Sequence, residues 1–232
     1  MKKMIVILLL SLLSCGGGSY LDLLQCNALR REKNKSLDDR ISGIQQRIKE
    51  LENDENKRKQ FPLLMGDLYS NMGNRLLEAG QWDAAIDAFN NALKNGRGGH
   101  SVYYSLGLAY GNKASMSKNM EDINKAQWNY EKALELEPGY NTAKYSLAIL
   151  LFFQKDEKAK AIAMMEEVVA ANRSYFKARF ALGRFYYDTD KIDKSRRVYE
   201  ELSADLEKAP DSEIILDYRR QCGENLQNLM NR

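Results

Sequence analysis

The stretch YSNMGNRLLEAGQWDAAIDAFNNAL, residues 69–93, decides the fold of this 232-residue chain. It reads as two amphipathic helices, because apolar residues recur in it at helical spacing. Three small residues, Gly73, Ala85 and Ala92, stand where one helix would pack against another. A glycine inside a helix costs about 1 kcal/mol relative to alanine. Glycine at such a position therefore indicates that the packing requires a small residue.

The same order of small, large and aromatic residues recurs three more times along the chain. The position of Gly73 is taken in the later copies by Gly107, Ala148 and Gly183. The position of Phe89 is taken by Tyr130, Met165 and Tyr199. We interpret the recurrence as a packing requirement: two helix backbones approach closely where the residue is small, and larger side chains fill the space beside them.

This pattern resembles the tetratricopeptide repeat (TPR), a helix-turn-helix unit of about 34 residues. The resemblance covers residues 63–209 and implies an all-α fold, a right-handed superhelical stack of about four hairpins. The expected repeats lie at about 66–99, 100–140, 141–175 and 176–209. Residues 20–62 are expected to form an N-terminal amphipathic helical region, and residues 210–232 a C-terminal capping helix.

The second copy is seven residues longer than the first. Gly107 and Ala126 are 19 positions apart, whereas Gly73 and Ala85 are 12 positions apart. Seven residues make about two helical turns, so the insertion either lengthens both helices or forms a protruding loop. We favour the longer helices.

A short heptad pattern precedes the repeats. Its apolar residues are Leu37, Ile41, Ile44, Ile48 and Leu51. The pattern lasts about two heptads, whereas a coiled coil needs three to four. The favoured interpretation is a helix that packs against the first repeat as an N-terminal cap, and dimerisation through residues 37–51 is the alternative.

The chain begins with MKKMIVILLLSLLSCGGGS, in which two lysines precede a run of mostly apolar residues from Met4 to Leu13. Ten residues are too few to cross a hydrocarbon core of about 30 Å, so the run is typical of an export signal rather than of a transmembrane helix. The order Leu12, Leu13, Ser14, Cys15 resembles the lipobox of bacterial lipoproteins, in which the cysteine is acylated and becomes the mature N-terminus.

The lipoprotein resemblance implies a signal peptide at residues 1–14 and a lipidated Cys15, with palmitate among its acyl chains. Residues 15–19 would form the lipidated, glycine-rich tether. Gly16, rather than an aspartate, follows the cysteine, which is similar to the outer-membrane sorting pattern of Gram-negative lipoproteins. The expected location is therefore the cell envelope, at the periplasmic face of the outer membrane.

The TPR resemblance also implies a concave wall, formed by the first helix of each hairpin, that holds peptides or partner helices. The expected partner-binding residues are Asn74, Tyr104, Leu108, Tyr145, Ile149, Phe152, Phe180, Arg184 and Tyr187. Aromatic side chains are typical anchors of protein recognition surfaces. In the alternative interpretation, these rings are covered by the N-terminal helix or pack between adjacent repeats.

Other classes of function find little support in the sequence. The chain has 35 Lys and Arg against 32 Asp and Glu, a net charge of +3, and its charges are mixed in sign, which argues against nucleic-acid binding. The single histidine, His100, lies in GRGGHS without a partner pattern for catalysis or zinc. The sequence predicts no enzyme, cofactor or metal site. Cys26 and Cys222 are expected to be isolated thiols.

Together these features predict a membrane-anchored scaffold or adaptor that mediates protein–protein interactions in the bacterial cell envelope. An accessory role in an outer-membrane assembly or secretion machine fits this layout, and the partner would be an envelope protein or peptide. The alternative is a ligand-handling subunit of a solute transport system that binds a small apolar molecule against the aromatic rings.

Overall fold

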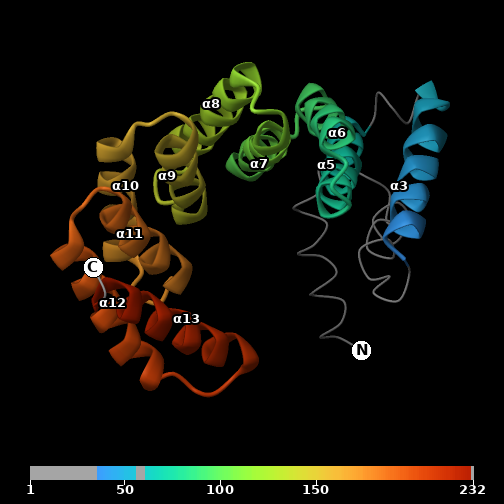
Figure 1. The fold of residues 1–232 in the computed structure, drawn as a ribbon. Coiled ribbons are helices and arrows are strands. Elements are labelled where there is room, and N and C mark those ends of the chain that lie inside the picture. Colours follow the sequence, from blue (N-terminus) through green and yellow to red (C-terminus); the bar gives the residue numbers. More distant parts are fainter. Residues whose placement is uncertain (1–35, 56–60, 231–232) are drawn as a thin grey trace. The chain divides into compact units, whose positions relative to one another are not determined.

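The structure, a computed structural model, describes residues 36–55 and 61–230. These residues form ten α-helices and no strand, which confirms the predicted all-α class. The helices are α3 (Leu37–Glu52), α5 (Pro62–Glu78), α6 (Trp82–Lys94), α7 (His100–Ser117), α8 (Met120–Leu136), α9 (Asn141–Gln154), α10 (Lys158–Ala171), α11 (Phe176–Asp188), α12 (Ile192–Glu207) and α13 (Glu213–Met230) (Figure 1). The predicted signal peptide, Cys15, the tether and Cys26 lie outside the described residues.

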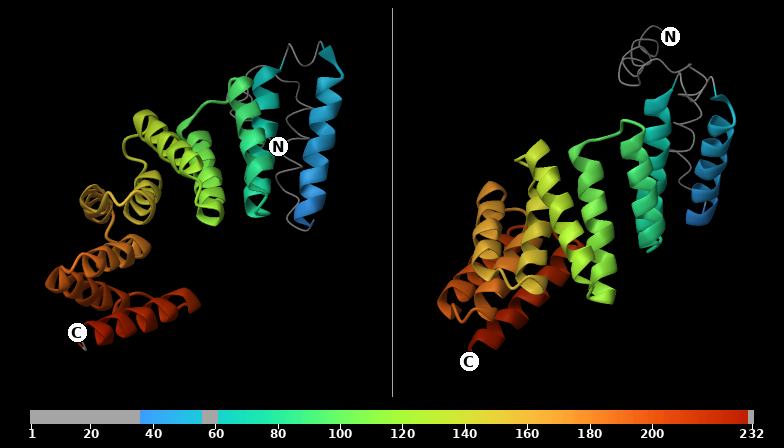
Figure 2. Two further views of the ribbon diagram at one scale, coloured as in Figure 1. Left: turned by 45° about the horizontal axis from the view of Figure 1, so that its top comes forward. Right: turned by 90° about the horizontal axis from the view of Figure 1, so that it is seen from above.

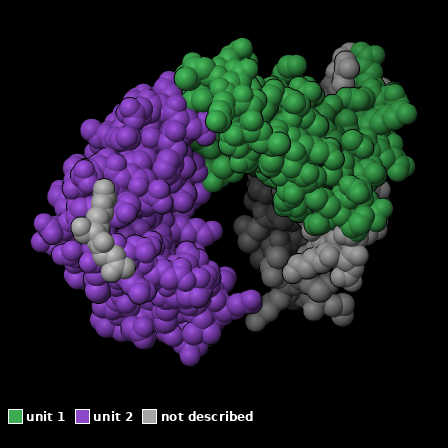
Figure 3. Space-filling model, viewed as in Figure 1, with its two compact units in different colours: residues 1–138 green, residues 139–232 purple. Residues whose placement is uncertain are grey.

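The chain divides into two compact units, residues 1–138 and residues 139–232 (Figure 3). Unit 1 contains α3 and the hairpins α5–α6 and α7–α8, and unit 2 contains the hairpins α9–α10 and α11–α12 followed by α13. Within each unit the two helices of a hairpin lie side by side, and the hairpins stack in chain order (Figures 1 and 2). In the described residues, no helix is both long and apolar enough to cross a membrane.

The small residues of the repeats lie where the two helices of a hairpin meet. A Cβ atom added at Gly73 would lie 2.7 Å from the ring of Phe89, which is closer than real Cβ contacts occur. A Cβ at Gly107 would lie 2.5 Å from the ring of Tyr130. The glycines are thus required for close packing, as predicted, but the ring occupies the space of the missing side chain directly instead of lying beside it.

The two other hairpins follow the same rule with their own residues. A Cβ at Gly183 would lie 2.6 Å from the ring of Tyr199. In the third hairpin, Ala148 and Met165 take the corresponding places, and both are fully buried. A flexible methionine adapts to a neighbouring methyl group better than a flat ring does. The exchange of glycine for alanine therefore accompanies the exchange of the ring for methionine.

The insertion in the second hairpin lengthens both of its helices, as predicted. α7 ends at Ser117, ten residues beyond Gly107, whereas α5 ends at Glu78, five residues beyond Gly73. Only Lys118 and Asn119 connect α7 to α8. The backbone of Lys118 is left-handed, with a φ of 52°, and the side chain of Asn119 caps α8 by accepting a hydrogen bond from the amide of Glu121 at 2.8 Å. The hairpin thus turns in two residues without a protruding loop.

The heptad residues of α3 are buried within unit 1. The apolar side chains of Ile44, Ile48 and Leu51 form one cluster with Leu68 and Tyr69 of α5. The hydroxyl of Tyr69 donates a hydrogen bond to the carboxylate of Glu52 at 2.6 Å. The interpretation as a cap is therefore confirmed. Within the chain, the first repeat covers the apolar side of this helix, and dimerisation through residues 37–51 stays a prediction.

The last helix, α13, covers the apolar face that the final hairpin leaves open. Cys222 is a free, fully buried thiol, and its Sγ donates a hydrogen bond to the carbonyl of Tyr199 at 3.2 Å. Ser212 caps the helix by accepting a hydrogen bond from the amide of Ile215 at 3.2 Å. Burial raises the pKa of the Cys222 thiol. This cysteine thus behaves as a small core residue rather than as a reactive group.

Candidate partner-binding site

The expected partner-binding residues of unit 1 lie on the first helices of its two hairpins. Asn74 is exposed on α5, and its Oδ1 accepts a hydrogen bond from the hydroxyl of Ser105 on α7 at 3.3 Å. Tyr104 and Leu108 are half-buried on α7. The ring of Tyr104 lies 6.0 Å from that of Tyr130, so one of its faces is occupied within its own hairpin. Unit 1 therefore offers a mixed, mostly polar surface here.

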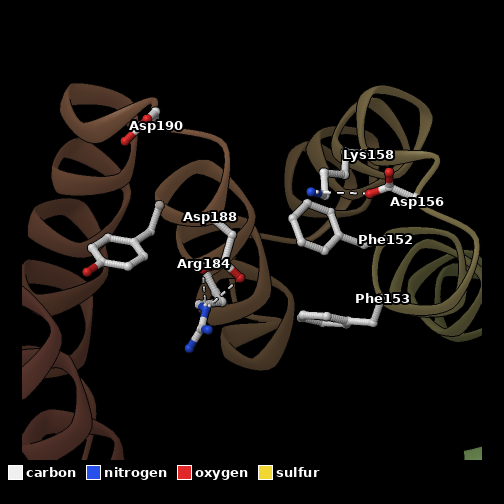
Figure 4. Close-up of a pocket in the computed structure, with 8 residues that line it drawn as sticks. Phe152, Phe153, Asp156, Lys158, Arg184, Asp188 and Asp190 are labelled. Atoms are coloured by element: carbon white, nitrogen blue, oxygen red, sulfur yellow. Dashed lines mark hydrogen bonds and ion pairs between the residues drawn. The ribbon is translucent and has the colours of Figure 1, made fainter.

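In unit 2, three of the expected residues line one cavity of about 560 Å³ (Figure 4). We call this cavity the unit 2 pocket. Its lining consists of Phe152, Phe153, Asp156, Lys158, Arg184, Tyr187, Asp188 and Asp190. Phe152, Arg184 and Tyr187 were expected from the sequence, whereas the other five were not.

The pocket lies where the first helices of two adjacent hairpins end. Phe152 and Phe153 belong to the last turn of α9, and Arg184 and Asp188 to the end of α11. The turns that follow these helices contribute Asp156 and Asp190, both in the left-handed region, with φ values of 55° and 60°. Aspartate tolerates this conformation better than most residues do. The repeat thus places an aspartate in the corresponding turn of two successive hairpins.

The two neighbouring phenylalanines of α9 have different roles. Phe152 is only 4% exposed, and its ring stacks on that of Phe185 with centroids 3.9 Å apart. Phe153 is 56% exposed, and its ring extends toward α11 (Figure 4). The ring of Phe152 therefore packs between α9 and α11, which is the alternative that the sequence left open, although the residue still lines the pocket. The exposed aromatic residue of the pocket is its neighbour, which the sequence analysis missed.

Phe180, on α11, also differs from expectation. Its ring lies 6.1 Å from that of Tyr199 and 5.5 Å from that of Tyr218 on α13. The C-terminal helix thus covers part of Phe180, which is half-buried and packs against the apolar cluster of α12 and α13. Tyr145, in contrast, is half-buried with its ring 5.4 Å from that of Tyr175, and Ile149 is half-buried on the same helix.

Charged side chains surround the aromatic part of the pocket. The Nε of Arg184 donates to both carboxylate oxygens of Asp188, at 2.8 and 2.7 Å. This hydrogen bonding raises the pKa of the Arg184 guanidinium. The ammonium of Lys158 lies 3.2 Å from a carboxylate oxygen of Asp156 and 6.0 Å from the centroid of the Phe152 ring. With Asp190, the pocket holds three carboxylates and two cations, a formal charge of −1.

The arrangement is suited to binding. Its eight lining residues include no serine, threonine, cysteine or histidine. No group of three metal-ligating side chains occurs among the residues that the structure describes. Acidic, basic and aromatic groups at the mouth of a cavity of this size are typical of sites that hold a few side chains of a partner.

Comparison with known proteins finds family models that match part of the repeats. Sequence profiles of the tetratricopeptide repeat match residues 70–112 and 107–140. No curated protein matches the chain in sequence. Structures resembling this one include MamA, from residue 41 to its end, of Desulfovibrio magneticus RS-1, with a TM-score of 0.66 and 17% identity, covering 84% of this chain and 99% of that one.

Two further solved structures are similar at comparable identity. A thermophilic TPR protein of Thermus thermophilus matches with a TM-score of 0.61 and 18% identity over 88% of this chain and 95% of that one. YrrB, a TPR protein with an unusual peptide-binding site, matches with a TM-score of 0.60 and 16% identity over 92% and 97%. At these identities the likeness concerns the fold alone. The chain is an all-α protein that contains tetratricopeptide repeats, a fold that typically binds peptides or proteins.

Proposed function

We propose that this protein is a lipid-anchored scaffold of the bacterial cell envelope, which binds a protein partner through the unit 2 pocket. The pocket carries the proposal for binding, because it joins an exposed phenylalanine to a ring of charged groups within a single cavity. The leader sequence that precedes Cys15 carries the proposal for anchoring. An accessory role in outer-membrane assembly or secretion fits both parts.

Phe153 is the residue on which partner binding is expected to depend most. An aromatic side chain that is 56% exposed beside charged groups loses apolar contact with water when a partner covers it. Binding energy at protein interfaces is concentrated in a few such residues, with polar groups around them. Phe153, the half-buried Tyr187 and the charged rim reproduce that arrangement.

The alternative function, the handling of a small apolar molecule, is less well supported. Five of the eight residues that line the pocket are charged. Covering charged groups with an apolar molecule removes them from water without replacing their hydration, which is unfavourable. A peptide segment brings its own hydrogen-bonding groups, so a partner protein fits the pocket better.

Capture of the partner tests the proposal for binding. The full-length chain, carrying an affinity tag, is expressed in the organism that encodes it and recovered after cross-linking, as wild type, Phe153→Ala and Trp128→Ala. Trp128 is the matched control, because it is also 56% exposed but lies on α8 in unit 1. We expect one partner to be lost with Phe153→Ala and retained with Trp128→Ala. Equal recovery from all three proteins would overturn the proposal.

Fatty-acid labelling tests the proposal for anchoring. Cells that express the wild type or Cys15→Ser are fed an alkyne-tagged palmitate, and the membranes are then separated and washed. Lipidation at Cys15 predicts label and membrane retention in the wild type, and loss of both in the variant. Label that persists in Cys15→Ser would show that the anchor is elsewhere or that the labelled group is not a lipoprotein anchor.

A further inference from the structure

We infer that the unit 2 pocket takes a basic side chain of the partner, the ammonium of a lysine or the guanidinium of an arginine. The inference rests on the proposed function, since it names the chemistry that the same pocket recognises. Two features of the pocket favour a cation: its carboxylates and its aromatic rings.

The carboxylates outnumber the cations in the pocket. Asp156, Asp188 and Asp190 face two cationic groups, so the pocket keeps a formal charge of −1 before a partner arrives. The Asp156 carboxylate is well exposed, with 84% of its side chain open to solvent. An arriving cation can therefore approach it without displacing buried groups.

The rings provide a place for the cation and for the chain that carries it. A cation is attracted to the face of an aromatic ring within about 6 Å of its centroid. Within this chain, the ammonium of Lys158 already lies 6.0 Å from the ring of Phe152 and 3.2 Å from Asp156. The pocket thus holds one cation between a ring and a carboxylate, and the exposed Phe153 offers a second ring to a cation of the partner.

An acidic side chain fits the same pocket less well. The two cations of the pocket are already engaged, Arg184 by Asp188 at 2.7 Å and Lys158 by Asp156 at 3.2 Å. An arriving carboxylate would also face Asp190. The negative charge of the pocket therefore opposes an arriving carboxylate, whereas it favours an arriving cation.

Three matched peptides test the inference directly. Fluorescent, capped pentapeptides of the sequence Leu-Ala-X-Ala-Leu, with X as Arg, Gln or Glu, are titrated against the full-length chain and followed by anisotropy. We expect the Arg peptide to bind at millimolar concentration or below and the Glu peptide to bind least. Raising the salt concentration should reduce the difference in affinity between the Arg and Glu peptides, because exposed charges are screened. Equal binding of all three peptides, or no binding of the Arg peptide at millimolar concentration, would overturn the inference.

Single substitutions locate the effect in the pocket. Asp190→Asn removes one carboxylate of the pocket. It is expected to weaken binding of the Arg peptide by about two- to fivefold, without changing the affinity for the Gln peptide. Asp193→Asn is the matched control, because its side chain is 96% exposed on α12 and does not line the pocket. An equal effect of both variants would show a general charge effect and contradict the inference.

The outcomes separate this inference from the proposed function. Loss of the cellular partner with Phe153→Ala, together with equal binding of the three peptides, would leave the scaffold proposal in place and remove the preference for a basic side chain. Selective binding of the Arg peptide without any captured partner would leave the pocket's preference in place and remove the scaffold proposal.

Discussion

At the scale of single residues, the repeats depend on a ring that lies against a glycine. The rings of Phe89, Tyr130 and Tyr199 occupy the places that a side chain at Gly73, Gly107 and Gly183 would need. Dispersion contacts are lost or turned into repulsion by shifts of well under 1 Å, so this pairing is sensitive to a single added methyl group. The recurrence of small and aromatic residues in the same order could be read from the sequence, whereas the direct contact of ring and glycine could not.

The glycine pairing predicts a destabilised protein when a side chain is added. Gly107→Leu should lower the free energy of unfolding by about 1–3 kcal/mol, because the added Cβ would lie 2.5 Å from the Tyr130 ring. Gly223→Ala is the control, since a Cβ there meets nothing within 4 Å and alanine favours the helix by about 1 kcal/mol. Denaturant unfolding measures both. A free energy of unfolding that is the same in Gly107→Leu as in the wild type would refute this account of the packing.

A second prediction concerns the buried Arg179. Its Nη1 donates to Asp205 at 2.7 Å, while the residue is only 2% exposed. Asp205→Asn should lower the free energy of unfolding, because a buried cation then lacks its carboxylate. Asp193→Asn, on an exposed position, should leave unfolding unchanged. A stability of Asp205→Asn equal to that of the control would contradict the importance of this pair.

The Asp205 pair also predicts an acid dependence. The hydrogen bond from Arg179 lowers the pKa of the Asp205 carboxyl below its usual 3.8. A lowered folded-state pKa contributes stability that is present above pH 3.8 and is lost as the pH falls through the folded-state value. The difference in stability between the wild type and Asp205→Asn should therefore shrink below about pH 4. Urea unfolding at several acidic pH values checks this, and a constant difference would contradict it.

At the scale of helices, the lengthened hairpin and the N-terminal cap could be predicted from the sequence. Which side chains are covered by a neighbouring helix could not be predicted. The insertion after Gly107 and the heptad spacing of residues 37–51 predicted two long helices and a cap, because helical periodicity is a local property. The roles of Phe152 and Phe153 could not be assigned, because they depend on the position of the neighbouring α11. Phe180 was misassigned for a similar reason, since α13 covers it.

The contact between α3 and α5 predicts an alkaline dependence of the N-terminal cap. Burial and the hydrogen bond to Glu52 raise the pKa of Tyr69 to about 12, from the usual 10.0. A raised folded-state pKa gives stability that is complete below pH 10.0 and is lost as the pH rises toward 12. Hydrogen exchange in α3 should therefore accelerate over this range, beyond the intrinsic effect of pH. Tyr69→Phe should lack that extra acceleration, and an identical pH profile would contradict the prediction.

At the scale of the whole molecule, the two units differ in the features that they contain. Residues 139–232 hold the pocket, the exposed Phe153 and the charged rim, while residues 1–138 hold the N-terminal cap and the lengthened hairpin. The sequence predicted one series of similar hairpins and did not indicate which of them carries a cavity. The pocket forms because aspartates of two turns and aromatic rings of two hairpins come together. The repeat pattern alone does not indicate which pair of hairpins brings such residues together.

The central claim is that a partner protein contacts the unit 2 pocket, and site-specific photo-cross-linking tests it most directly. A photoreactive amino acid replaces Phe153 in the full-length chain in living cells, and the same replacement is made separately at the equally exposed Trp128. The account predicts a discrete adduct with one partner protein from position 153 and none from position 128. No adduct from position 153, or the same adduct from both positions, would contradict it.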